Sequence, residues 1–176
     1  MLDFIYAKPV RWPLTALALS ALMLATAHAF EQFGGLAPCL LCLRQREAYW
    51  AAIALSVAIL VALRFNTSKS SQATILALLA LAFATGAVIA LYHAGVEWRF
   101  WPGPKECAAG GIGNFSGVDL AGALGAPVKV VRCDEVPWSF LALSMAGWNS
   151  LISLALAAAS ALACLVTLKR EEPING

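Results

Sequence analysis

Residues 38–63 read PCLLCLRQREAYWAAIALSVAILVAL, in which two cysteines and a short polar stretch lead into an apolar run. The apolar part, Tyr49–Leu63, is long enough to cross a membrane only together with Cys42–Ala48, because a helix needs about 20 residues to span a hydrocarbon core of about 30 Å. Backbone groups that face lipid must find their hydrogen bonds within the chain, so we predict a transmembrane helix over about residues 43–63. Both cysteines then lie at the N-terminal end of this helix.

Three more apolar runs, at about residues 14–30, 73–93 and 146–168, have the same character. Of the 176 residues, 61% are hydrophobic and 12% are charged, whereas soluble domains carry about 25% charged residues. We therefore predict an all-α membrane protein, a bundle of four transmembrane helices in a single domain that spans residues 1–176. The net charge is only +2 and the basic residues are scattered, which argues against binding to nucleic acid.

Basic residues indicate the orientation of the four helices. They occur in the amino-terminal segment, in the link between the second and third runs and in the carboxy-terminal tail: Lys8, Arg11, Arg64, Lys69, Lys169 and Arg170. Four crossings put these segments on one side, which the positive-inside rule assigns to the cytoplasm. We therefore expect both termini in the cytoplasm, and loops 31–42 and 94–145 in the periplasm. Loop 94–145 also carries basic residues, so the difference in positive charge between the two sides is modest.

The first apolar run has a second interpretation. Lys8 and Arg11 resemble the basic start of a secretory signal peptide, and AHA at residues 27–29 resembles a cleavage site. Against cleavage, the run is long for a signal peptide and leads directly into the segment that carries the first cysteines. Cleavage would leave those cysteines on the same side of the membrane.

Loop 94–145 is too long for a simple connection between helices. Its middle part is rich in Gly and Pro, where we expect little regular structure. The aromatic residues near its start, Trp98, Phe100 and Trp101, are typical of anchors at a membrane surface. Val136–Ala146 is apolar with few charges, which predicts a short helix lying in the interface before the fourth span. Alternatively, this segment simply lengthens that span.

Cys39 and Cys42 have the C-x-x-C spacing, which permits a reversible disulfide. At the N-terminus of a helix a thiolate is stabilised by the helix dipole, and Arg44 and Arg46 add positive charge. A structural disulfide or one half of a zinc site would have the same spacing. The position at a membrane surface, in an oxidising compartment, favours redox chemistry, so we interpret the pair as catalytic.

Cys107 and Cys133 lie far apart in the second outer loop. A disulfide between them would restrain the loop by about 3 kcal/mol in the chain-entropy model. An exposed disulfide in a loop with little core is also readily attacked, so we interpret this pair as redox-active. Four thiolates could bind zinc instead, but the second pair is too widely spaced for a structural zinc site, and we expect no metal. Cys164, near the cytoplasmic end of the fourth span, is interpreted as a small apolar residue.

Arg46 follows Cys42 by four residues and shares its side of a helix, whereas Arg44 faces elsewhere. An arginine inside a membrane helix is costly and commonly extends to lipid phosphates, the role that we assign to Arg44. We interpret Arg46 as binding a carbonyl of a lipid-soluble electron acceptor beside the thiol. His28 and His93 lie at the outer ends of the first and third spans, where either could line a site near Cys42 or serve as a hydrogen-bonding anchor. For His28 the anchor is favoured, and His93 stays a candidate for binding the acceptor.

These features together resemble the DsbB family of bacterial inner-membrane thiol oxidases. The resemblance covers nearly the whole chain, from PCLLCLRQR at residues 38–46 through Cys107 and Cys133 to WSFLALSMAGW at residues 138–148. It implies a four-helix bundle that reoxidises a periplasmic, DsbA-like partner of the thioredoxin fold. It also implies that the electrons pass to a membrane quinone, either ubiquinone or menaquinone.

The same resemblance implies roles for single residues. The quinone would lie beside Cys42 and Arg46, the positions that match the family's motif. Some family members have Glu before that arginine, whereas Gln45 occupies the position here. Any role of that acid is therefore absent from this chain.

The resemblance also implies the order of disulfide exchange. Cys107 would bond the partner protein, and Cys133 would complete the loop pair. The reduced loop pair would then pass its electrons to Cys39 and Cys42 by exchange. Each step is a displacement by a thiolate, so the thiolate fraction and the pKa of the leaving thiol set the rates.

Two other classes of protein fit part of the pattern. A quinone reductase of the vitamin K epoxide reductase type also joins a four-helix bundle to a C-x-x-C motif. That family usually carries the motif late in the chain and its loop cysteines early, which is the reverse of the order here. A non-enzymatic membrane scaffold held by disulfides would differ from both in binding no quinone.

Overall fold

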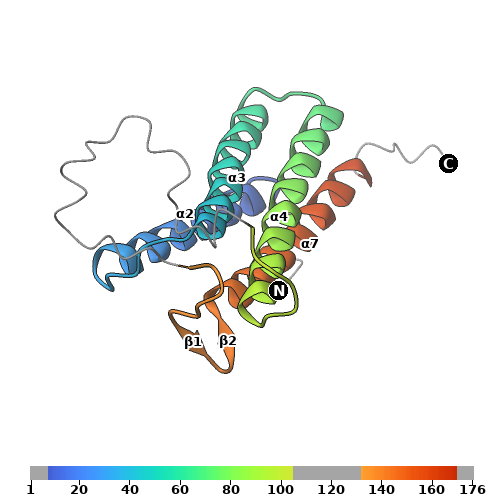
Figure 1. Ribbon diagram of the computed structural model, residues 1–176. Helices are drawn as coiled ribbons and strands as arrows, with labels where there is room; N and C mark the ends of the chain where they lie inside the picture. Colours follow the sequence, from blue (N-terminus) through green and yellow to red (C-terminus); the bar gives the residue numbers. More distant parts are fainter. Residues whose placement is uncertain (1–7, 105–131, 170–176) are drawn as a thin grey trace, which may run out of the picture.

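Four long helices make up most of the chain that the computed structural model describes, residues 8–104 and 132–169 (Figure 1). They are α2 (Arg11–Gln32), α3 (Leu40–Arg64), α4 (Lys69–Glu97) and α7 (Met145–Lys169). Each is long and apolar enough to cross a membrane. The predicted class, an all-α membrane protein with four spanning helices, is therefore confirmed.

The helices extend beyond their apolar runs by one to four residues at an end, and side-chain caps that hydropathy does not register mark the start of α3 and of α4. The Sγ atom of Cys39 accepts a hydrogen bond from the backbone N–H of Cys42 at 3.3 Å and caps the start of α3. Ser68 caps α4 in the same way, accepting from the N–H of Ser71 at 3.2 Å. Such caps supply partners for N–H groups that the helix itself cannot satisfy.

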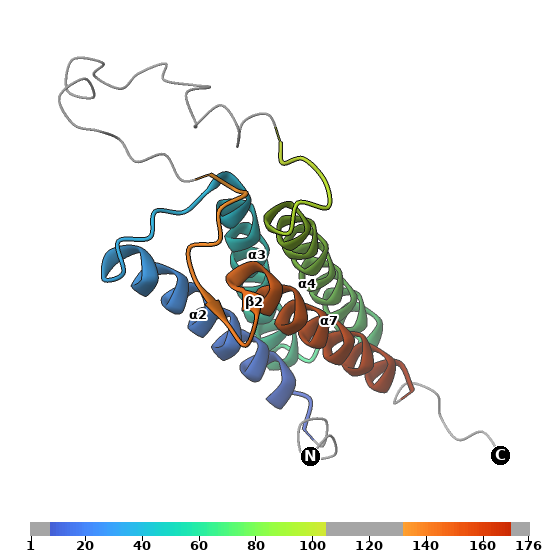
Figure 2. The ribbon, with the colours of Figure 1, turned by 60° about the horizontal axis from the view of Figure 1, so that its bottom comes forward.

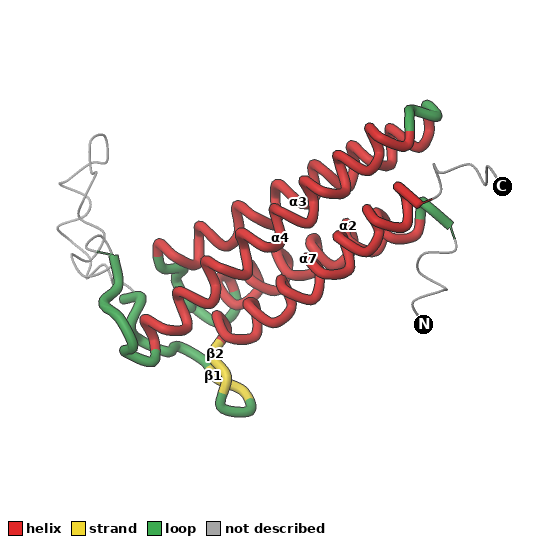
Figure 3. The backbone as a smooth tube through the Cα atoms, turned by 90° about the vertical axis from the view of Figure 1, so that its right-hand side faces the viewer, coloured by secondary structure: helices red, strands yellow, loops and turns green. Residues whose placement is uncertain are grey.

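The helices lie side by side in an antiparallel order. The link between α3 and α4 lies at the same end as the start of α2 and the end of α7, whereas residues 33–39 and 98–104 lie at the opposite end (Figure 3). Because alternate links lie at opposite ends, the arrangement is the one expected of four successive crossings. Cys107 and the Gly-rich segment lie outside the described residues.

Packing within the bundle is uneven. α4 packs against both α3 and α7, whereas α2 packs mainly on α3 and makes few contacts with α7. Close approach of α4 to its neighbours depends on Gly86, where an added Cβ would lie 3.0 Å from the Cβ of Ala48 and 3.7 Å from the Oγ of Ser153. Phe83, Ile59 and Leu79 are fully buried in the main core.

The segment before the fourth helix is not the short interfacial helix that we expected. Its structure is a small hairpin, β1 (Ser139–Phe140) paired antiparallel with β2 (Leu143–Ser144), and α7 begins directly after it. Leu141 and Ala142 form the turn with positive φ angles of 52° and 62°, the conformation that a two-residue hairpin turn requires. The aromatic side chains of Trp138 and Phe140 are two residues apart and stack on each other, so their spacing reflects a strand rather than a helix.

The hairpin lies between the outer halves of α2 and α7 (Figure 2). The ring of Trp138 contacts Phe30 of α2, with ring centroids 5.7 Å apart. The indole N–H of Trp148 on α7 donates to the carbonyl oxygen of Phe140 at 3.0 Å. These contacts link the two helices at the end of the bundle that carries Cys39.

Candidate functional site

A cavity of about 480 Å³ opens beside the first cysteine pair. Its lining is mostly apolar. It comes from all four helices, from the loop between α2 and α3 and from the hairpin. Aromatic side chains form one wall: Phe30, Trp138, Phe140 and Trp148. Sites of this size that are apolar with a few polar groups are typical of small organic ligands.

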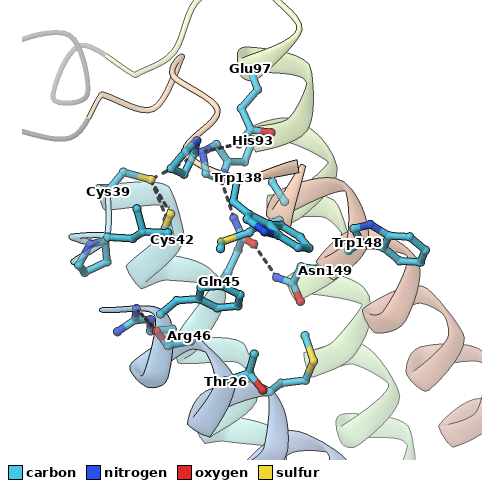
Figure 4. A pocket seen from close by; sticks show the side chains of 18 of the residues that line it. Thr26, Cys39, Cys42, Gln45, Arg46, His93, Glu97, Trp138, Trp148 and Asn149 are labelled. Atoms are coloured by element: carbon cyan, nitrogen blue, oxygen red, sulfur yellow. Dashed lines mark hydrogen bonds and ion pairs between the residues drawn. The ribbon is translucent and has the colours of Figure 1, made fainter. Parts of the chain in front are cut away.

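Cys39 and Cys42 both line this cavity, with their sulfur atoms next to each other (Figure 4). Their Sγ atoms are 2.7 Å apart, whereas a disulfide bond is about 2.05 Å long. Closing the bond therefore requires only a small movement of the two side chains. The hydrogen bond with Cys42, together with burial, raises the pKa of the Cys39 thiol above its ordinary range, so in the reduced pair Cys39 keeps its proton.

Cys133 packs near Cys39. Cys133 is disulfide-bonded and 1% exposed. It belongs to a buried cluster with Cys39, Leu41 and Val96, against which Cys42 packs. The structure thus brings a cysteine of the second loop to the first pair, while Cys107 lies outside the described residues. The sequence alone does not predict which loop cysteine lies there.

His93 faces the first cysteine pair from α4. Its Nε2 atom lies 3.6 Å from the Sγ of Cys39, and its ring is also hydrogen-bonded to the backbone of Cys133. Its Nδ1 atom is 2.9 Å from the side-chain nitrogen of Gln45, which donates to it. An Nδ1 that accepts leaves the proton on Nε2, so the histidine is a donor toward the sulfur side.

The hydrogen bonds continue from Gln45 across the bundle. The Nδ2 atom of Asn149 on α7 donates to the Oε1 of Gln45 at 2.5 Å, and the hydroxyl of Tyr49 donates to the Oδ1 of Asn149 at 2.5 Å. Ser153 lies 2.9 Å from the same hydroxyl. The resulting network, Tyr49–Asn149–Gln45–His93, joins three helices. Its part from Asn149 through Gln45 to His93 is seen in Figure 4.

Arg46 and Arg44 have different surroundings. The guanidinium of Arg46 pairs with Glu31 of α2 at 2.7 Å, is 15% exposed and borders the cavity. Arg44 pairs with Glu47 on the exposed side of α3. The structure therefore has Arg46 on the cavity side and Arg44 on the outer side. His28 does not line the cavity among the described residues, and its Nδ1 lies 2.8 Å from the carbonyl oxygen of Leu24 within the same helix.

Sequence reasoning missed several polar side chains of this site. Glu97 is buried at the end of α4, where it accepts a short hydrogen bond from Ser144 of β2 and lies 3.9 Å from His93. Asn149 and Tyr49 were counted as parts of apolar spans. A polar residue within a spanning helix is costly and therefore needs partners inside the bundle. Asn149 and Ser153, four residues apart on α7, carry this signal.

The comparisons with known proteins agree with this geometry. Residues 9–163 match the family model described as disulfide bond formation protein DsbB. The chain is also 34% identical over 150 residues to the disulfide bond formation protein B of Methylococcus capsulatus (strain Bath), an alignment that covers 81% of this chain and 85% of that protein. No solved structure matches the chain. With four spanning helices, a C-x-x-C pair at the mouth of one of them and a family match over most of its length, the chain belongs to the DsbB family of membrane proteins, the oxidoreductases of disulfide bond formation.

Proposed function

We propose that this protein reoxidises a periplasmic dithiol protein of the DsbA type and passes the electrons to a membrane quinone, ubiquinone or menaquinone. The observation that carries the proposal is the mostly apolar cavity that Cys39 and Cys42 line. The proposal includes a location in the bacterial cytoplasmic membrane, with both termini in the cytoplasm and the cavity at the periplasmic end.

The lining of the cavity fits a quinone head group. A flat, largely apolar ring can lie among the aromatic side chains of Phe30, Trp138 and Phe140. Arg46 offers guanidinium N–H groups for a carbonyl oxygen, and its pairing with Glu31 fixes its position. A quinone bound there would supply the acceptor of two electrons and two protons that oxidation of a dithiol requires.

The contacts of Cys39 support a direction for disulfide exchange between the two cysteine pairs. Cys39 packs in one buried cluster with Cys133, and its Sγ atom lies 2.7 Å from that of Cys42. A thiolate on Cys133 is therefore positioned to attack the sulfur of Cys39, which breaks the Cys39–Cys42 bond and leaves a thiolate on Cys42. Cys42 lines the cavity whereas Cys133 does not, so the charge reaches the cavity by this displacement.

The complete reaction conserves electrons. The partner dithiol loses two electrons and two protons and leaves as a disulfide, while the loop disulfide formed by Cys107 and Cys133 becomes a dithiol. The loop dithiol then reduces the Cys39–Cys42 disulfide and is reoxidised. His93, with its proton on Nε2, faces the Cys39 sulfur and can stabilise negative charge that develops there.

The experiment that tests this proposal separates the two transfers. Purified Cys39→Ser protein in detergent is mixed with reduced DsbA-type partner, and the redox state of the loop cysteines and the absorbance of added quinone are followed. We expect the partner to reduce the loop disulfide, as in the wild type, while quinone reduction stops because the inner disulfide cannot form. Quinone reduction at the wild-type rate would contradict transfer through the inner pair.

A second measurement tests the assignment of Cys107 and Cys133. With a partner that lacks its second cysteine, the mixed disulfide cannot be released and accumulates. We expect the partner to be bonded to Cys107 in the Cys133→Ser variant, as determined by mass spectrometry of the linked peptides. A mixed disulfide that forms with Cys133→Ser only at Cys39 or Cys42 would contradict the role of the loop pair.

A further inference from the structure

The first cysteine pair and His93 together form a group of three metal-ligand side chains. The Sγ atoms of Cys39 and Cys42 and a ring nitrogen of His93 all lie within 4.8 Å of one another. They come from the start of α3 and the end of α4, and Cys39 and His93 are buried. Two thiols and an imidazole are ligands that zinc prefers in proteins.

The distances between these donor atoms are close to those of a tetrahedral site. With zinc–sulfur bonds of about 2.3 Å and zinc–nitrogen bonds of about 2.0 Å, neighbouring ligand atoms in a tetrahedron lie about 3.5–3.8 Å apart. The Sγ of Cys39 and the Nε2 of His93 already lie 3.6 Å apart. The two sulfur atoms, now 2.7 Å apart, have to separate by about 1 Å, which a small rotation of the partly exposed Cys42 side chain allows.

Glu97 lies beside the histidine of this group but does not come within 4.8 Å of all three donor atoms. Its Oε1 atom lies 3.9 Å from the Nε2 of His93, and its Oε2 accepts the hydrogen bond from the hydroxyl of Ser144. One oxygen is thus fixed by Ser144 while the other faces the histidine, so the carboxylate is a charged neighbour of the site and not one of its ligands. The Glu97 side chain is 2% exposed, and a cation beside it would offset the cost of burying a carboxylate.

The network behind His93 is compatible with a metal ligand. A neutral histidine that binds a metal through Nε2 carries its proton on Nδ1 and donates it to an acceptor. The side-chain amides of Gln45 and Asn149 can each be flipped by 180°, because an amide donates at its nitrogen and accepts at its oxygen. The hydroxyl of Tyr49 can both donate and accept a hydrogen bond. The network can therefore run in the reverse direction, with the oxygen of Gln45 accepting from Nδ1.

We propose that the reduced protein binds one divalent cation of the zinc class through Cys39, Cys42 and His93, with water as the fourth ligand. Binding replaces the protons of the two thiols with the metal, so two protons leave and no electron is transferred. The disulfide form has no thiolate to offer and does not bind the metal. A bound cation therefore holds the pair in its reduced state and, on the proposed function, inhibits the oxidase.

Binding is measured without turnover, with Co²⁺ as a coloured probe for Zn²⁺. The variant Cys107→Ser/Cys133→Ser, which lacks the loop thiols, is reduced in quinone-free detergent, freed of reductant and titrated with Co²⁺. We expect one equivalent to bind with sulfur-to-cobalt absorption and the intense visible bands of tetrahedral Co²⁺, and Zn²⁺ to displace it. The same sample oxidised to the Cys39–Cys42 disulfide is the internal control and should show neither spectrum.

Variants identify the ligands. We expect Cys42→Ser to abolish the sulfur-to-cobalt absorption of the tetrahedral site, and His93→Ala to weaken binding about ten- to a hundredfold. Cys164→Ala, which removes from the double variant its one thiol outside the proposed site, should bind as before. Absence of the tetrahedral spectrum, equal binding by the oxidised protein, or loss of binding in Cys164→Ala would each overturn the site.

Inhibition is tested separately from binding. Wild-type protein is reduced, incubated with Zn²⁺ and assayed for quinone reduction before and after a chelator is added. We expect activity to be lost with Zn²⁺ and recovered with the chelator. Activity that is unchanged by bound Zn²⁺ would overturn the inhibition, whereas a protein that binds Co²⁺ but never reduces quinone would contradict the proposed function and leave the metal site intact.

Discussion

At the scale of single residues, Arg44 and Arg46 are a matched pair for a test. They lie two residues apart on α3, yet Arg46 borders the cavity and Arg44 lies on the exposed side. If Arg46 holds a quinone oxygen, Arg46→Ala removes a charge-assisted hydrogen bond worth about 1.5–3 kcal/mol, or about ten- to more than a hundredfold in kcat/KM for quinone. Steady-state kinetics with a soluble quinone should show this loss for Arg46→Ala and much less for Arg44→Ala. Equal losses in the two variants would mean that their different surroundings do not matter for activity.

The two thiols of the first pair are expected to react differently with alkylating agents. The hydrogen bond with Cys42 and burial raise the pKa of Cys39, and only a thiolate is alkylated. A group with a raised pKa stays protonated while an ordinary cysteine ionises, and each unit lowers the thiolate fraction about tenfold. Between pH 7 and 9, iodoacetamide should therefore modify Cys42 well before Cys39 in the reduced protein, as followed by mass spectrometry of the peptides. Faster modification of Cys39 at pH 8 would contradict this order.

Residue patterns predict some parts of the site and not others. The spacing of Cys39, Cys42 and Arg46 places them on one side of a helix, and the structure has all three at the cavity. The pairing of Arg46 with Glu31 could not be predicted, because it depends on how α2 packs against α3. The packing of Cys39 with Cys133 could not be predicted either, because the length of a loop does not indicate where a cysteine within it lies.

At the scale of elements, the network of α3, α4 and α7 predicts a stability effect. Replacing Asn149 with Leu leaves the Oε1 of Gln45 without its buried donor, whereas the hydroxyl of Tyr49 loses one partner and keeps Ser153. An unsatisfied buried polar group costs about 1–3 kcal/mol, so Asn149→Leu should lower the free energy of unfolding in detergent by about that amount. The control is Leu151→Ala on the exposed side of the same helix, for which we expect a smaller change. Thermal or denaturant unfolding of both variants is the measurement.

Elements were predictable where one physical effect dominates. The need to satisfy backbone groups in lipid fixes the four helices, which apolar run length alone identifies. The hairpin before α7 could not be predicted from hydropathy, because a short interfacial helix and a short pair of strands can have the same apolar composition. The alternation of Trp138 and Phe140 was the available signal, but the turn at Leu141 and Ala142 has positive φ angles that these residue types rarely adopt.

At the scale of the whole molecule, the orientation of the bundle determines which cysteines meet the periplasm. One end of the bundle carries Arg11, Arg64, Lys69 and Lys169, and the opposite end carries Cys39. If the positive-inside rule holds, a membrane-impermeant thiol reagent applied to spheroplasts after reduction should label Cys39 or Cys42 and the loop cysteines, but not Cys164. Labelling of the loop cysteines only after lysis would show that the orientation is inverted. Cys164→Ala, at the opposite end, should leave activity unchanged.

The uneven packing of α2 bears on whether the concentration of quinone should be expressed per volume of water or per amount of lipid. Because α2 rests on α3 and makes few contacts with α7, the cavity is bounded on that side by the hairpin and not by packed helices. On the proposed function, a long-tailed quinone would then enter sideways from the hydrocarbon phase, in which such molecules partition almost completely. The relevant concentration becomes the mole fraction of quinone in lipid. At a fixed amount of long-tailed quinone, doubling the lipid or detergent should therefore about double the apparent KM expressed per volume of water, whereas a water-soluble, tail-less quinone should show little dependence.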